Sequence, residues 1–184
     1  MKKTIVCLLV LFVFGLTSCL TVEKKSYTIK LEKDGSGVLT IDYYNIFAEL
    51  SEDEKPEDAK QYFDELMKDY FNGEILTKLY PNVKTIKKEL FEKDGKLCGR
   101  VIIDFGKISD IGLYQQTKKS DLMFALCSSM FSETYLASNG MYGGESMPVV
   151  FWNKKEKNLQ LDTSLTEPTD KSVSLLNYYL DSKK

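Results

Sequence analysis

The amino-acid sequence predicts an α+β fold: an antiparallel sheet built from three β-hairpins, with helices packed on one face. Alternating apolar and polar residues flank Asp-Gly turns in two places, which is typical of hairpins. Between these places lie segments whose apolar residues recur at helical spacing. A chain of 184 residues with 43% hydrophobic content suits one domain.

The N-terminal end of the chain has the pattern of an export signal. Lys2 and Lys3 form a basic start, and residues 5–16 are apolar apart from one glycine. This run is shorter than the roughly 20 apolar residues that span a bilayer. It leads into Leu16, Thr17, Ser18 and Cys19, and this motif resembles the lipobox of bacterial lipoproteins. We therefore expect residues 1–18 to be a signal peptide that is cut between Ser18 and Cys19.

The lipobox resemblance implies that Cys19 is the lipid attachment site. A thiolate is a strong nucleophile and can take a diacylglycerol as a thioether. Stable anchoring needs at least two lipid chains, which this modification supplies. Leu20 follows in place of the Asp that retains such lipoproteins in the inner membrane, which favours the outer membrane in a cell that has two. The alternative is an ordinary secretory signal with an incidental cysteine.

After the signal, we expect an acylated cysteine and polar tether over residues 19–26 and a single α+β domain over residues 27–184. Apolar residues alternate from Tyr27 to Leu31, and a turn at Asp34 and Gly35 predicts the first hairpin. A helix is predicted from Glu57 to Phe71. Its apolar residues share one face: Ala59, Tyr62, Phe63, Leu66, Met67, Tyr70 and Phe71.

Similar patterns predict the elements of the second half. A hairpin is expected over residues 83–105 with its turn at Asp94 and Gly95. Ser120 has the character of an N-cap, so a buried helix is expected over residues 121–136. A third hairpin would pair residues 149–153 with 159–162, and a last helix would cover residues 170–180.

Composition excludes several functions. The chain has no histidine, so the commonest general base and the commonest metal ligand are missing. No catalytic residues, metal or cofactor are therefore expected. Removal of Lys2 and Lys3 with the signal leaves 23 basic residues against 27 acidic ones, which disfavours nucleic acid as a partner. Arg100 is the only arginine, so the chain has almost no planar guanidinium groups that could bind phosphate with two hydrogen bonds.

Cysteines and aromatic residues leave alternatives open. Cys98 and Cys127 follow the signal, and export to an oxidising compartment permits a disulfide between them, although two independent buried thiols are favoured. The aromatic stripe on residues 57–71 is either core or the wall of a groove for a hydrophobic ligand. The lysines at 84, 87 and 88 are most simply a solvated face.

Residues 27–41 begin a hairpin on Asp-Gly-Ser-Gly, close after an acylated cysteine. Over residues 19–47 the chain resembles LppM-like bacterial lipoproteins, although it lacks the C-terminal membrane span common in that family. The resemblance implies an envelope domain with affinity for hydrophobic or lipid ligands. The sequence as a whole predicts a non-enzymatic, membrane-anchored envelope module that binds or interacts with an envelope protein, with a lipid or hydrophobic-ligand carrier as the alternative.

Overall fold

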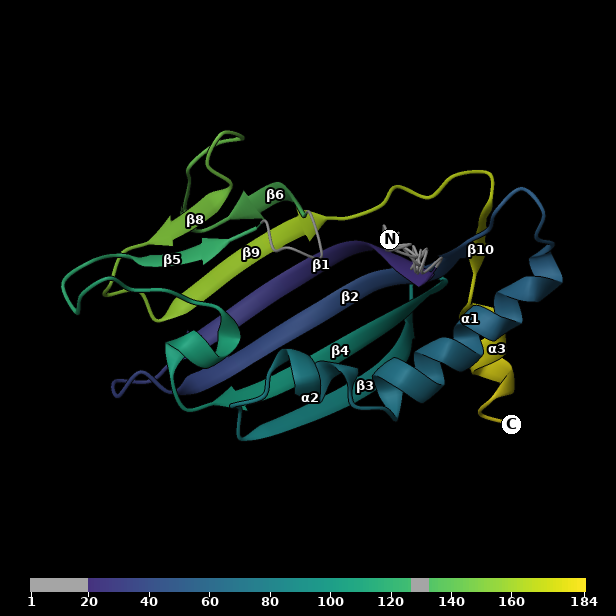
Figure 1. Cartoon of the computed structure of the whole chain (residues 1–184), viewed down its shortest axis with the longest axis horizontal. Coiled ribbons are helices and arrows are strands. Elements are labelled where there is room, and N and C mark those ends of the chain that lie inside the picture. The colour runs from purple at the N-terminus through teal and green to yellow at the C-terminus, as the bar shows by residue number, and fades with distance from the viewer. Residues whose placement is uncertain (1–19, 127–132) are drawn as a thin grey trace, which may run out of the picture.

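A computed structural model describes residues 20–126 and 133–184, and Ser18, Cys19 and Cys127 lie outside these ranges. Within the described ranges the strands form one seven-stranded sheet and one three-stranded sheet, with every strand pair antiparallel (Figure 1). A few short helices accompany them. The coarse expectation of a mostly antiparallel α+β protein is therefore confirmed, with more strand than helix.

The large sheet has the strand order β3-β4-β2-β1-β9-β6, and β10 pairs with the end of β2. The long central strands β1 and β2 run through most of the molecule (Figure 1). The strands of this sheet are β1 (Leu20–Leu31), β2 (Gly37–Glu49), β3 (Thr85–Lys93), β4 (Lys96–Phe105), β6 (Thr134–Ser138), β9 (Asn158–Ser164) and β10 (Ser172–Ser174).

Two of the three expected strand pairs are present. β1 pairs with β2 across the turn that contains Gly35, and β3 pairs with β4 across Asp94 and Gly95. All three of these turn residues have positive φ, at 86°, 53° and 70° respectively. Glycine and aspartate tolerate this left-handed region better than most residues, which is why Asp-Gly marks such turns.

The expected third hairpin is wrong. β8 (Val149–Trp152) belongs to the small sheet, between β5 (Leu122–Ala125) and β7 (Met141–Tyr142), whereas β9 pairs with β1 and β6. The two strands belong to different sheets, yet both send buried side chains into one hydrophobic cluster. The segment between them therefore crosses from one sheet to the other and does not turn within one.

The expected helix over residues 121–136 is also wrong, because the described parts of this segment are strands β5 and β6. Leu122 is buried, Met123 is half-buried, and Met123 pairs with both Tyr114 and Phe151. A short apolar run fits a buried strand as well as a buried helix. The lateral partners that decide between them are far away in the sequence.

The helix expected over residues 57–71 is confirmed. It consists of the 3-10 turn η1 (Pro56–Asp58), the α-helix α1 (Ala59–Glu65) and the π-helical segment η2 (Leu66–Phe71). The C-terminal helix is shorter than expected, because residues 172–174 pair as β10 before α3 (Leu176–Asp181) begins. The other helices are α2 (Ile75–Leu79) and the 3-10 helix η3 (Ile108–Ile111).

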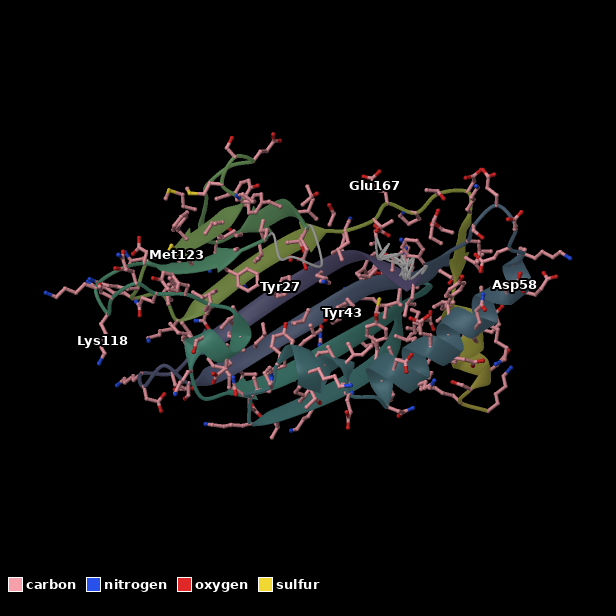
Figure 2. The ribbon with its side chains drawn as sticks, viewed as in Figure 1. Tyr27, Tyr43, Asp58, Lys118, Met123 and Glu167 are labelled. Atoms are coloured by element: carbon pink, nitrogen blue, oxygen red, sulfur yellow. The ribbon has the colours of Figure 1, made fainter. Side chains whose placement is uncertain are left out.

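Two hydrophobic clusters form the core. The first joins the large sheet to the small one and includes Leu39, Ile103, Trp152 and Leu159. The second joins the sheet to α1 and α3 and includes Ile46, Phe63 and Leu175. Tyr43 packs against both clusters, near the middle of the sheet (Figure 2).

The burial pattern of β2 changes at the boundary between the clusters. Leu39 and Ile41 are buried at alternate positions, whereas Asn45, Ile46, Phe47 and Ala48 are buried in succession. Asn45, the first of these four, has a φ of 57°, which lies outside the range of an extended strand. One strand thereby serves both clusters.

Candidate functional site

The N-terminal end of β1 is the part of the fold next to the proposed lipid attachment site. The tether expected over residues 19–26 is not present from residue 20 onward, because β1 begins at Leu20, opposite Ala48. On the other edge, Leu165 N–H donates to the Glu23 carbonyl at 3.0 Å, and the Thr21 hydroxyl donates to that of Thr166 at 2.9 Å. The polar residues of this segment belong to a strand, and its backbone is hydrogen-bonded to neighbouring segments on both sides.

Glu23 strengthens this end of the strand. Its Oε2 accepts hydrogen bonds from Asn45 Nδ2 at 2.8 Å and Lys96 Nζ at 3.0 Å. Burial acts to raise the pKa of Glu23, but these hydrogen bonds and the lysine charge lower it overall. The ionised carboxylate thus links β1 to the irregular part of β2 and to the start of β4. In the sequence, Cys19 directly precedes this strand.

Of the two cysteines that follow Cys19, the structure describes Cys98 and not Cys127. Cys98 lies in β4, is 2% exposed, and carries a thiol that is free of any disulfide among the described residues. Burial raises the pKa of this thiol, which makes it a poor nucleophile. Cys127 lies outside the described residues, so the disulfide between Cys98 and Cys127 stays untested.

A buried polar cluster surrounds Glu133, just before β6. Its carboxylate accepts hydrogen bonds from Lys25 Nζ at 2.8 Å, the Tyr27 hydroxyl at 2.8 and 3.0 Å, and the Thr163 hydroxyl at 2.7 Å. The side chains of Lys25 and Glu133 are only 13% and 10% exposed. Lys25 Nζ also lies 5.7 Å from the centre of the Tyr43 ring.

The cluster links strands β1 and β9 to the residue before β6. Both carboxylate oxygens of Glu133 already accept donors from β1 and β9. Burial, together with the nearby carboxylate, raises the pKa of Tyr27 far above its usual range, so its hydroxyl remains a donor. Sequence analysis missed this cluster, because its members are distant along the chain and Glu133 lies inside a segment that was predicted to be a helix.

The aromatic stripe on the helix is part of the core. Phe63 and Leu66 are buried with strand residues Val22, Ile46 and Leu97, and the Phe63 ring stacks on Tyr178 of α3 at 6.2 Å. Between the two sheets, a space lined by Tyr27, Phe124, Trp152 and neighbouring residues has a cavity volume of about 0 Å³. The buried residues of the stripe, Phe63 and Leu66, therefore belong to the core.

The three lysines expected to form a solvated face do so only in part. Lys88 is half-buried, and its Nζ donates to the carbonyls of Tyr70 and Gly73 at 2.9 and 3.0 Å. Carbonyls at the end of a helix attract cations, which accounts for this correction. A hollow of about 300 Å³ beside it is lined by Lys87, Lys88, Glu89, Arg100 and Ile102. Arg100 in this hollow is already paired with both carboxylate oxygens of Asp42, at 2.5 and 3.0 Å.

Within residues 20–126 and 133–184, no three His, Cys, Asp or Glu side chains gather as a metal-binding group. No helix within the same ranges is long and apolar enough to cross a bilayer. Comparisons with protein-family models, with curated proteins and with solved structures found no match to this chain. The resemblance to LppM-like lipoproteins accordingly stays a prediction from residues 19–47.

Proposed function

We propose that this protein is a membrane-anchored lipoprotein of the cell envelope, acylated at Cys19, that serves as a non-enzymatic binding or interaction module. In a cell with two membranes, we propose that the protein is located at the outer membrane. The observation that carries the proposal is the pattern of the N-terminal residues. A basic start at Lys2 and Lys3, a short apolar run and the lipobox-like residues 16–19 follow one another at the spacing of a lipoprotein signal. This motif predicts a mature protein that starts at Cys19.

The binding role is supported by the chemistry of the polar groups. Glu133 is saturated with hydrogen bonds, Arg100 is paired with Asp42, and Cys98 is buried. The chain has no histidine to act as a base at neutral pH. None of these residues offers an activated nucleophile beside a base.

The arrangement of the sheet also supports an interaction module. We infer that the helices pack on one face of the large sheet, because α1 and α3 contribute to the same buried cluster as strands β1, β2 and β4. Side chains such as Asp42 and Arg100 are partly exposed, at 37% and 42%, and belong to the other face. That face is polar and solvated, as expected of antiparallel sheets with one covered side.

Replacement of the acyl acceptor tests the proposal. In cells fed labelled palmitate, Cys19→Ser should lose the label and accumulate as uncut precursor, because the thiol is the group that takes the lipid. Cys7→Ser, in the apolar run of the signal, is the matched control and should be labelled, cut and retained with the membrane like the wild type. Fully processed Cys19→Ser protein in the membrane pellet would contradict the lipoprotein proposal.

A further inference from the structure

The outer face of the small sheet carries a row of large apolar side chains. Met123 of β5 pairs laterally with Tyr114 on one side and Phe151 of β8 on the other, and Phe151 pairs with Met141 of β7. Laterally paired residues point to the same face of a sheet. These four side chains therefore form a continuous row, which we call the apolar row, with Met147 close to β7 at Gly143.

The apolar row is turned away from the core. Leu122, Val150 and Trp152, at the alternate positions of β5 and β8, are buried in the first hydrophobic cluster. Tyr114 and Met141, by contrast, are 58% and 67% exposed, and Met147 is 49% exposed. A sheet with one face in the core and an apolar outer face presents a surface that water disfavours.

Lysines border one end of this row. The loop before β5 carries Lys118 and Lys119, and the loop after β8 carries Lys154 and Lys155, all exposed. The two loops are joined, because Lys154 Nζ donates to the Lys119 carbonyl at 3.0 Å. Figure 2 shows Met123 and Lys118 at the same end of the molecule. A net acidic body thus has a local basic rim beside an apolar face.

This combination fits a lipid surface better than a protein partner. Protein interfaces are enriched in methionine and aromatic residues but depleted of lysine. Anionic headgroups attract clustered lysines, while tyrosine, phenylalanine and methionine fit the boundary between headgroups and acyl chains. We propose that the apolar row and its lysine rim dock onto the surface of an anionic phospholipid bilayer. This inference rests on the proposed function, because the anchor at Cys19 would keep the domain at a bilayer and make a weak second contact effective.

Docking would also set the orientation of the domain. The anchor would precede the start of β1, whereas the loop after β8 lies beside its other end, where Leu31 N–H donates to the Lys157 carbonyl. The twelve residues of β1 span about 36 Å. With both ends at one surface, the domain would lie along the bilayer and not stand upright on its anchor.

Methionine oxidation tests the docking directly. The acylated full chain is placed on vesicles of phosphatidylcholine alone, or of phosphatidylcholine mixed with phosphatidylglycerol, and treated with hydrogen peroxide. Mass spectrometry then follows each methionine. Docking predicts that Met141 and Met147 oxidise about tenfold more slowly on the anionic vesicles, whereas Met67, in η2, oxidises equally on both.

Charge reversal provides the matched comparison. Lys118→Glu with Lys155→Glu should remove the protection of Met141 and Met147 on anionic vesicles. Lys68→Glu with Lys78→Glu makes the same change in net charge near the helices and should leave the protection intact. Equal oxidation of Met141 on both kinds of vesicle, with the protein still bound to them, would overturn docking while leaving the anchor untouched.

Two other outcomes are decisive as well. Protection that ignores lipid charge and increases with protein density on the vesicle would overturn lipid docking in favour of a second copy of this chain. Wild-type chain that carries no acyl group, by mass, would overturn the proposed anchor itself. The failure of docking and the failure of the proposed function are thus distinguishable.

Discussion

At the scale of single residues, Glu133 has the most consequential environment in the described structure. It brings together Lys25 and Tyr27 of β1 and Thr163 of β9 through one carboxylate. The desolvation of a buried ion pair offsets much of its Coulombic attraction, whereas the loss of one partner removes the attraction and keeps the desolvation of the other. The removal of one member of the cluster should therefore change the free energy of unfolding more than the intact cluster adds to it.

Glu133→Gln should lower the free energy of unfolding by about 3 kcal/mol, because it removes the carboxylate that is ion-paired with the buried Lys25 ammonium. Urea unfolding measures this change. Tyr27→Phe removes one hydrogen bond and keeps the ion pair, so its cost should be only about 1 kcal/mol. Lys25→Met added to Glu133→Gln should recover part of the loss. Equal stability of Glu133→Gln and wild type would show that the pair is dispensable.

At the scale of elements, the helix formed by η1, α1 and η2 explains why its stripe is aromatic. Phe63 and Leu66 reach the strands, while Tyr178 of α3 stacks on Phe63 from the same cluster. The stripe is wide because it has two neighbours to contact, the sheet and the C-terminal helix. The alternative that the protein carries a hydrophobic ligand assigned the same wide stripe to the wall of a ligand groove.

Phe63→Ala should destabilise the protein by about 3–5 kcal/mol, because the side chain is 6% exposed and its removal leaves a cavity. Thermal and urea unfolding measure the loss. Asp64→Ala, next in the helix but 60% exposed and paired with Lys60, should change stability by less than about 0.5 kcal/mol. The carrier hypothesis predicts otherwise: phospholipid or fatty acid would raise the Tm of the wild type, and this rise would be lost in a Phe63→Ala variant that remains stable.

At the scale of the whole molecule, three tyrosines from different parts of the chain contribute to the first hydrophobic cluster: Tyr27 is buried in it, and Tyr43 and Tyr80 are half-buried against it. Burial raises the pKa of Tyr27 and Tyr43 well above the ordinary value of 10.0, and raises the pKa of Tyr80 to about 12. Tyrosinate is the form that burial disfavours, so the folded protein keeps these hydroxyls protonated when the unfolded chain would lose them. We therefore expect the stability of the folded state to decrease at high pH.

Above about pH 10, stability should fall, because the unfolded state then binds fewer protons than the folded one. Each of the three tyrosines should contribute about 1.4 kcal/mol per pH unit until its own folded pKa is reached. Urea midpoints measured as pH rises give the slope, and ultraviolet absorbance of tyrosinate should appear together with unfolding. Tyr43→Phe should reduce the slope of stability against pH by the contribution of one tyrosine, about 1.4 kcal/mol per pH unit. Ionisation of all tyrosines in the folded protein would refute the assignment.

Local pattern was sufficient where neighbours along the chain decide the structure. The turns at Gly35 and at Asp94 and Gly95, and the helix over residues 57–71, follow from left-handed turn residues and from apolar spacing. Both kinds of signal lie within a few residues of the element they specify. The coarse α+β class follows from the same signals.

Tertiary partners decided the rest. Residues 21–26 are a strand because β2 and β9 supply hydrogen bonds on either side, although the polar side chains resembled a tether. Residues 122–125 are a strand because Phe151 and its neighbours lie alongside. Glu133 contacts Lys25 because β6 and β1 belong to one sheet. By itself the sequence determined two hairpin turns and the helix over residues 57–71, and it predicted the anchor. Pairing between distant segments determined the two sheets, the cluster around Glu133 and the exposed apolar row, because backbone groups and buried charges find their partners there.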